Sequence, residues 1–166
     1  TDPSKVVVAY DNGALLLFDI NSSSPALVCH TSQGVGTSAA LELPSDFASQ
    51  PNRIDTHSSL SLAVTVHEDA TMRLIDIRTG RNIETIEAHE GPVTGLSFDS
   101  SGLYAMTTGV DGLLKIWDLR QRSTVMQVRS HERIRGEGAT AVACHPVKSM
   151  IFSGGADSDL VALTRV

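Results

Sequence analysis

One spacing recurs along the chain and constrains its fold more than any other feature. Three kinds of mark repeat at the same interval of 42 residues. The pairs are Asp69 and Asp111, Asp76 and Asp118, and His89 and His131. A fixed interval of this size indicates repeated supersecondary units that bury their apolar faces against one another.

Each repeat has the pattern of several short strands. From residue 92 to residue 131 the runs "PVTGLSF", "LYAMTT", "LLKIWDL" and "STVMQVRSH" are separated by turn sequences such as "DSSG" and "VDG". Short β-rich runs between Asp, Ser and Gly turns predict antiparallel strands, and helical periodicity is weak throughout. Four strands per unit and a period of about 40 to 45 residues are typical of β-propeller blades. We therefore predict an all-β fold, a partial β-propeller of about three and a half four-stranded blades.

The predicted blades divide the chain into segments. Residues 1–30 would form an incomplete first blade, 31–51 a surface insertion, 52–88 the second blade, 89–130 the third, and 131–166 a last blade that lacks its outer strand. An unpaired edge strand invites association with another strand. We therefore expect either the carboxyl half of a larger propeller or two halves that associate into one ring.

The third unit, "AHEGPVTGLSFDSSGLYAMTTGVDGLLKIWDL", resembles the repeat of WD-repeat propellers. In that family a histidine, a Ser or Thr, an aspartate and a tryptophan form a hydrogen-bonded set within each blade. The resemblance assigns this set to His89, Thr107, Asp111 and Trp117. The physical reason is general, because a buried indole N–H needs an acceptor and a buried imidazole can pass the hydrogen bond on to a carboxylate.

The other units keep only part of this set and are expected to rely on apolar packing. The second unit has no matching histidine. The residues retained are Thr65 and Asp69 in the second unit, and His131, Ser153 and Asp157 in the fourth. The position of the tryptophan is taken by Phe18, Ile75 and Leu163 in the first, second and fourth units, and Asn12 takes the aspartate position in the first.

From about Pro51 to Val166 the chain resembles the carboxyl end of striatin-family proteins. The order of the phrases "VTVHEDATMRLIDIRTG" and "CHPVKSMIFSGGAD" carries this resemblance. Striatin-family proteins are scaffolds whose coiled coil docks protein phosphatase type 2A and which also gather kinases and a Mob-family protein. Because this chain has no coiled-coil heptads, the resemblance implies the propeller platform alone, in the cytoplasm, with those partners bound through regions outside the chain. The alternatives are a WD-repeat scaffold of an unrelated complex and a propeller-based enzyme.

One segment has the composition of a partner contact. "RSHERIRGEG" concentrates three arginines, and arginine is enriched at interface hot spots. A solvated loop is the alternative. The candidate partner-binding residues are Arg129, Arg133, Arg135, Glu90 and His67.

Composition and spacing argue against other classes of function. The net charge is −6 with scattered basic residues, which does not suit a nucleic-acid backbone. No apolar run approaches the roughly 20 residues of a membrane span. The six histidines lack metal-ligand spacing, and the two cysteines, Cys29 and Cys144, lie far apart in the sequence, as expected of free thiols.

Two motifs that resemble catalytic or cofactor sites are weak. Gln33 to Ala40 has glycines at dinucleotide-binding spacing, but its surroundings are loop-like. Cys144 and His145 are adjacent on a predicted strand, so their side chains point to opposite faces and cannot act as a nucleophile and its base. The sequence therefore predicts a non-catalytic protein without cofactor or metal.

Overall fold

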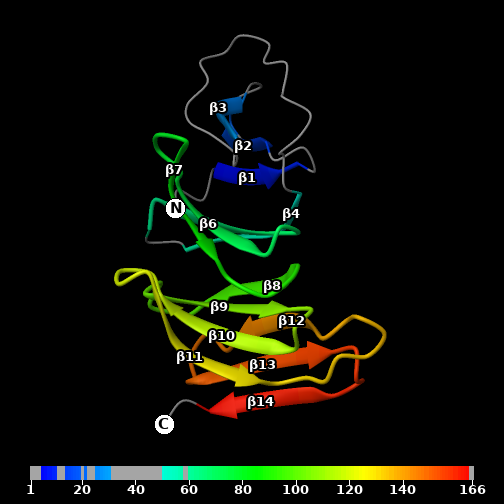
Figure 1. The fold of residues 1–166 in the computed structure, drawn as a ribbon. Coiled ribbons are helices and arrows are strands. Elements are labelled where there is room, and N and C mark those ends of the chain that lie inside the picture. The colour runs from blue at the N-terminus through cyan, green and yellow to red at the C-terminus, as the bar shows by residue number, and fades with distance from the viewer. Residues whose placement is uncertain are drawn as a thin grey trace.

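The computed structural model describes residues 5–10, 14–19, 21, 25–30, 50–57 and 60–164. Within these residues fourteen strands form four antiparallel sheets, and there is no helix (Figure 1). Residues 31–49 of the insertion predicted at 31–51, the glycines of the Gln33–Ala40 motif and Asn12 lie outside the described residues, and Pro51 already belongs to a strand.

In each sheet the strands follow one another in sequence order, as in a meander. The first sheet contains β1 (Lys5–Ala9), β2 (Ala14–Asp19) and β3 (Pro25–His30), and the second contains β4 (Pro51–Thr56), β5 (Leu62–His67), β6 (Thr71–Asp76) and β7 (Arg81–Glu87). The third contains β8 (Val93–Phe98), β9 (Tyr104–Gly109), β10 (Leu113–Asp118) and β11 (Ser123–Arg129), and the fourth contains β12 (Ala139–Cys144), β13 (Met150–Gly155) and β14 (Leu160–Thr164).

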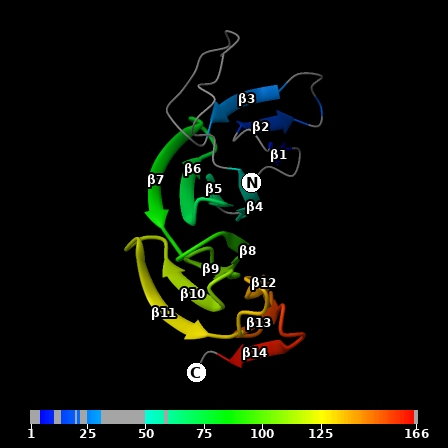
Figure 2. The same ribbon diagram turned by 45° about the vertical axis from the view of Figure 1, so that its right-hand side comes forward.

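The sheets are stacked as successive blades. The first strand of the third sheet, β8, lies against β4 of the second sheet and β12 of the fourth. The last strands, β7 and β11, lie on the outer side of the stack (Figure 2). Two four-stranded and two three-stranded sheets in this arrangement confirm the predicted all-β fold, a partial propeller.

The apolar core is divided among the contacts between neighbouring sheets. A cluster that includes Leu15, Leu17 and Ile75 joins the first and second sheets. The largest cluster joins the second and third sheets and contains Met72, Val93 and Trp117 among others. The third contains Met106, Leu114, Ile116 and Ile151, between the third and fourth sheets. Because successive side chains of a strand point to opposite faces, each central sheet contributes to two of these clusters.

The tight turn between the second and third strands of a sheet has the same backbone in three sheets. The third residue after the end of the second strand has a positive φ at Ala70 (66°), Gly112 (79°) and Ser158 (68°). At Gly112 a side chain would also collide with the carbonyl group of His131. Each of these residues directly follows the aspartate that marks the repeat, so the turn and the aspartate form one repeated unit.

The segment before the fourth sheet is more ordered than the loop predicted from its sequence. Ile134 and Glu137 exchange two backbone hydrogen bonds of 2.7 and 3.1 Å. Arg135 (φ 55°) and Gly136 (φ 90°) form the two-residue turn between them. Two successive residues with positive φ are typical of a type I′ β-hairpin. This short hairpin therefore presents Arg135 at its tip.

Candidate functional site

In the third sheet four polar side chains form one continuous hydrogen-bonded set. Trp117 Nε1 donates to Thr107 Oγ1 (2.9 Å), and Thr107 Oγ1 lies 2.8 Å from His89 Nε2. His89 Nδ1 lies 2.9 Å from Asp111 Oδ2. Since a carboxylate only accepts, His89 Nδ1 carries the proton. All four residues are buried, so the set joins β9 and β10 to the connection between β7 and β8 inside the protein.

Asp111 is the anionic end of this set. It also accepts backbone N–H groups from Leu113 (3.0 Å) and Glu90 (3.2 Å). Burial raises the pKa of Asp111, but the hydrogen bonds from His89, Leu113 and Glu90 outweigh burial and hold the pKa at about 2. The carboxylate therefore fixes both its own turn and the connection that enters the sheet.

The fourth sheet has an equivalent set without the tryptophan. His131 Nδ1 lies 2.9 Å from Asp157 Oδ1, and His131 Nε2 lies 3.0 Å from Ser153 Oγ. Burial raises the pKa of Asp157. The hydrogen bonds from His131 and from two backbone N–H groups lower this pKa by more, so the net shift is downward. Leu163 takes the place of the indole and packs against the cluster between the third and fourth sheets.

The Ser153–His131–Asp157 contacts have the connectivity of a nucleophile, base and orienting acid. In a hydrolase the serine hydroxyl must reach a substrate carbonyl. Here Ser153 and His131 are each 2% exposed, so a substrate has no access to the hydroxyl. The arrangement can hold strands together but cannot carry out acyl transfer in this conformation.

The second sheet pairs its polar residues differently. Thr65 Oγ1 lies 2.8 Å from His67 Nε2, within one strand. Asp69 accepts the Nη2 group of Arg73 at 2.6 Å and also binds Thr71. Asp69 therefore contacts an arginine where the third and fourth sheets have a histidine.

His67 corrects one expectation from the sequence. It was predicted to contact a partner, but its side chain is 0% exposed and bonds to Thr65. The reason is its position at the end of a central strand, which is covered on both faces. The spacing of two residues from Thr65, which places both side chains on one face of the strand, is the signal that could have identified this contact.

The other candidate partner residues lie at the surface. Arg133, Arg135 and Glu90 are exposed, and Arg133 and Arg135 flank Ile134 on the hairpin. Arg129 is exposed at the end of β11, where its Nη1 is 3.4 Å from the carbonyl oxygen of Asp111. Their role in binding a partner stays a prediction.

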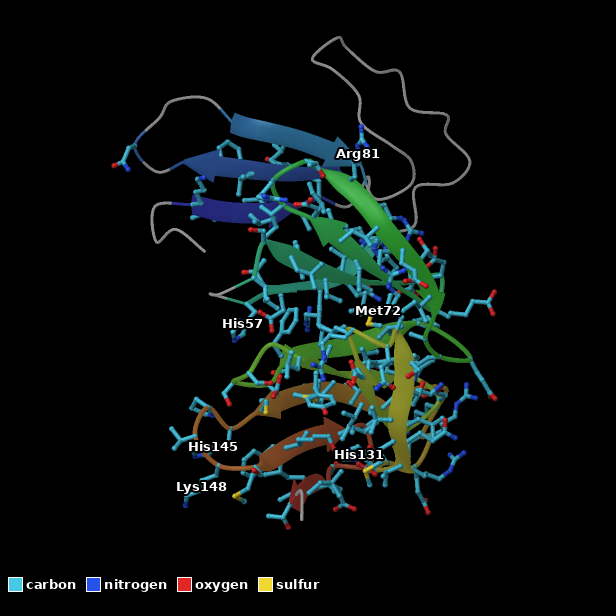
Figure 3. The ribbon with its side chains drawn as sticks, turned by 90° about the vertical axis from the view of Figure 1, so that its left-hand side faces the viewer. His57, Met72, Arg81, His131, His145 and Lys148 are labelled. Carbon is cyan, nitrogen blue, oxygen red and sulfur yellow. The ribbon has the colours of Figure 1, made fainter. Side chains whose placement is uncertain are left out.

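The two ends of the sheets differ in character. The His–Asp contacts lie at one end, where Figure 3 shows His131 in the interior. His57, His145 and Lys148 lie at the opposite end (Figure 3). Within the described part of the chain, no three His, Cys, Asp or Glu side chains gather as metal ligands, and no helix is long and apolar enough to cross a membrane.

Comparison with known proteins gives matches along nearly the whole chain. The family model described as "WD domain, G-beta repeat" matches residues 80–118. Striatin-4 from Mus musculus is 34% identical over 158 residues, which is 95% of this chain and 19% of that protein. Striatin-4 from Homo sapiens is 32% identical, and striatin from Homo sapiens is 30% identical, each over 95% of this chain. The chain spans about a fifth of the length of these curated relatives.

Proposed function

Because the chain matches a WD-repeat region of the striatin family, we propose that it is the non-catalytic interaction platform of a striatin-type scaffold. The observation that carries this proposal is the match to striatins over 95% of the chain. WD-repeat relatives of this kind support a role in protein–protein interaction. The finer part of the proposal is that the scaffold assembles protein phosphatase type 2A with kinases.

The interior chemistry supports a non-catalytic role. The polar sets of the third and fourth sheets are buried and make their hydrogen bonds to one another. Among the described residues, exposed side chains lie in turns at the ends of the sheets and along the outer strand β11. Turns held by a rigid scaffold are common sites of binding.

The partners are proposed from the family resemblance. We propose that phosphatase type 2A, kinases and a Mob-family protein bind through regions of the scaffold outside this chain, and that the assembly is cytoplasmic. Other proteins would bind the sheet ends directly. We further propose that the fourth sheet pairs along β14 with another strand of the same protein or of a second copy. A WD-repeat scaffold of an unrelated complex is the second candidate.

Affinity purification of the native protein followed by mass spectrometry tests the proposal. We expect the phosphatase catalytic and structural subunits together with a Mob-family protein. A matched control is the same protein with residues 5–164 deleted, which should keep the phosphatase and lose the partners that bind the platform. Recovery of neither phosphatase nor Mob-family protein would contradict the striatin-type assembly and favour the second candidate.

A further inference from the structure

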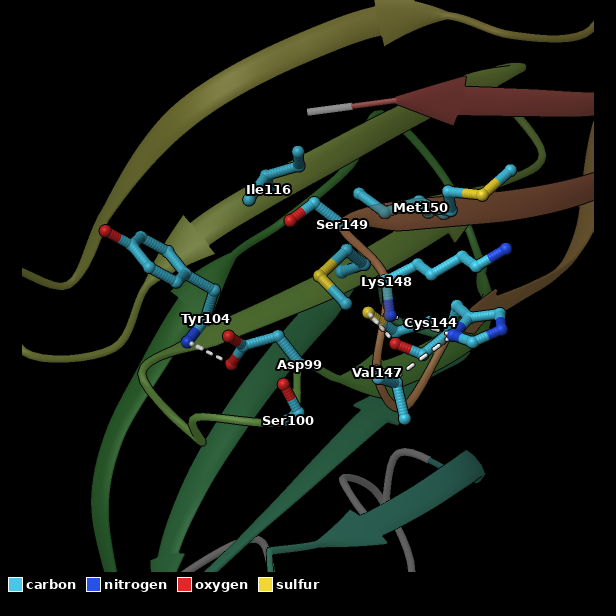
Figure 4. A pocket seen from close by; sticks show the side chains of 12 residues that line it. Asp99, Ser100, Tyr104, Ile116, Cys144, Val147, Lys148, Ser149 and Met150 are labelled. Carbon is cyan, nitrogen blue, oxygen red and sulfur yellow. Dashed lines mark hydrogen bonds between the residues drawn. The ribbon is translucent and has the colours of Figure 1, made fainter. Parts of the chain in front are cut away.

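A small pocket lies between the third and fourth sheets (Figure 4). Its lining includes His145 and Lys148, which lie at the end of the sheets opposite the His–Asp contacts (Figure 3). The third sheet contributes Tyr104, Met106 and Ile116, and the fourth contributes Cys144, Met150 and Ile151. The β8–β9 turn and the β12–β13 turn form its rim. Neither turn takes part in the hydrogen-bonded sets described above.

The floor of the pocket is part of the apolar core. Met106, Ile116 and Ile151 are 1%, 8% and 6% exposed and belong to the cluster between the two sheets. Burial and the nearby Asp99 raise the pKa of Cys144, so this side chain is a neutral thiol. An apolar group that enters the pocket would therefore extend the existing core and leave water.

The size of the pocket restricts its occupant. The volume of this pocket, which is partly open to solvent, is about 90 Å³. Sites for small-molecule ligands and cofactors are usually roughly 300 to 1,000 Å³, and an apolar cavity of about 150 Å³ holds benzene. The pocket therefore has room for one aliphatic side chain and not for a cofactor.

The rim holds an apolar side chain out into solvent. His145 Nδ1 accepts the backbone N–H groups of Val147 (3.1 Å) and Lys148 (2.9 Å), which fixes the β12–β13 turn. Val147 at the tip of this turn is 87% exposed. A fixed turn loses little conformational freedom when a partner binds, so an exposed valine beside an apolar pocket is suited to an interface.

The two charged side chains on the rim, Asp99 and Lys148, differ in the contacts that they make. Asp99 is engaged within its own turn, where it accepts the N–H of Tyr104 (3.0 Å) and the hydroxyl of Ser101 (2.6 Å). Lys148 is exposed, and no carboxylate of the described residues lies within ion-pair distance of it. Lys148 is therefore the rim cation that a partner's carboxylate can pair with, whereas Asp99 keeps its negative charge within the other turn.

We propose that this pocket docks a peptide segment of a partner protein that inserts one aliphatic side chain over Met106 and Ile151 and places a carboxylate beside Lys148. Val147 covers the inserted side chain from the rim. The inference rests on the proposed function as an interaction platform and adds the place and the kind of partner sequence. It locates binding at the end of the sheets that the buried His–Asp contacts do not occupy.

A random peptide display library panned on the native full-length protein tests this. We expect enrichment of peptides in which Leu, Ile or Met lies next to Asp or Glu. The affinity of an enriched peptide, measured by fluorescence anisotropy, should fall about tenfold or more in Lys148→Glu and in Val147→Asp. Arg81→Glu is the matched control, because it makes the same charge change at an exposed position at the start of β7, on a sheet that does not line the pocket, and it should leave the affinity unchanged. Alkylation of Cys144 by iodoacetamide should slow when the peptide is bound.

The other outcomes overturn the inference. Enriched peptides whose affinity is the same in both pocket variants would place binding elsewhere and leave the proposed function intact. A dimer of the protein that Val147→Asp dissociates would assign the pocket to a second copy. Failure to enrich any peptide would remove the docking site, while the purification described above would decide the proposed function independently. Because both substituted side chains are exposed, circular dichroism should show that the variants fold as the wild type does.

Discussion

The second and third sheets place different side chains at equivalent positions of the same four-strand meander. Thr65 and Thr107 correspond, as do Asp69 and Asp111. In the third sheet the histidine that bonds to both of these positions comes from the preceding connection, 22 residues before the aspartate. In the second sheet the bonds are local, over two residues to His67 and four to Arg73. The third set therefore joins distant segments, whereas the second strengthens one strand and one turn.

Two further pairs of equivalent residues, Trp117 with Ile75 and Lys115 with Arg73, also make more hydrogen bonds to other segments in the third sheet than in the second. Trp117 fills the space toward the second sheet and donates its N–H to Thr107, whereas Ile75 fills the space toward the first sheet by packing alone. Lys115 Nζ donates to the carbonyl oxygen of Ala88 (2.7 Å). Arg73 occupies the matching position, but its Nε and Nη1 atoms find no partner among the residues that the structure describes. The position of Trp117 and Ile75 is thus stabilised by a hydrogen bond and packing in the third sheet, and by packing alone in the second.

The largest expected effect comes from removing the indole. Trp117→Ala should lower the free energy of unfolding by about 3 to 5 kcal/mol, because it empties a core position and leaves Thr107 without a donor. Urea unfolding followed by circular dichroism measures this, since the protein's only tryptophan is lost. Trp117→Phe keeps a ring and should cost less. A shift in the melting temperature of under about one degree for Trp117→Ala would contradict the account.

The two buried histidines should differ in importance. His89→Ala removes the partner of a buried carboxylate and should cost about 3 kcal/mol. His67→Ala breaks a contact within one strand, and we expect its cost to be smaller by about 1 kcal/mol or more. Equal losses from the two variants, measured by urea unfolding under the same conditions, would show that the long-range set has no special role.

The Asp111 carboxylate should make stability depend on pH. Its native pKa of about 2 lies below the ordinary value of 3.8, so the unfolded state takes up a proton first as pH falls. The stabilisation is present above pH 3.8 and is lost as pH falls through the native value of about 2. Denaturant titrations from pH 6 downward should show a smaller acid loss in Asp111→Asn. Identical pH profiles for wild type and variant would contradict this.

The smallest effect is expected at Arg73. A buried guanidinium with two atoms unpartnered among the described residues gains little from its single ion pair, so Arg73→Met should stay within about 1 kcal/mol of wild type or be more stable. Lys115→Met, in the third sheet, loses the bond to the Ala88 carbonyl and should cost about 1 to 2 kcal/mol. A lower free energy of unfolding for Arg73→Met than for Lys115→Met, measured by urea unfolding, would contradict the expected difference between the two sheets.

The repeat carried most of what the sequence could predict. The interval of 42 residues and the turn chemistry predict the four-strand units, and the structure confirms the all-β partial propeller. The resemblance to WD-repeat propellers, and not the spacing itself, placed His89 and Asp111 in one expected set, and the two side chains lie 2.9 Å apart. Local interactions are not marked by the repeat. The Thr65–His67 contact lies within one strand, and the Arg135–Gly136 turn lacks the Asn-Gly or Asp-Gly pair that usually indicates a two-residue hairpin.

The pocket between the third and fourth sheets was beyond sequence reasoning for a different reason. Its floor comes from three strands of two sheets, and its depth depends on how those sheets pack. Periodicity indicates which side chains face inward, but not where packing leaves a gap. The exposure of Val147 likewise depends on the turn that His145 holds.

Hydrogen-exchange mass spectrometry of the native protein, alone and in its purified complex, tests the central claim that these sheets are an interaction platform. The account predicts slower exchange on binding in turns at the sheet ends, first of all in the β8–β9 and β12–β13 turns beside the pocket. Unchanged exchange in all peptides from residues 5–164, with protection only in other parts of the complex, would contradict it.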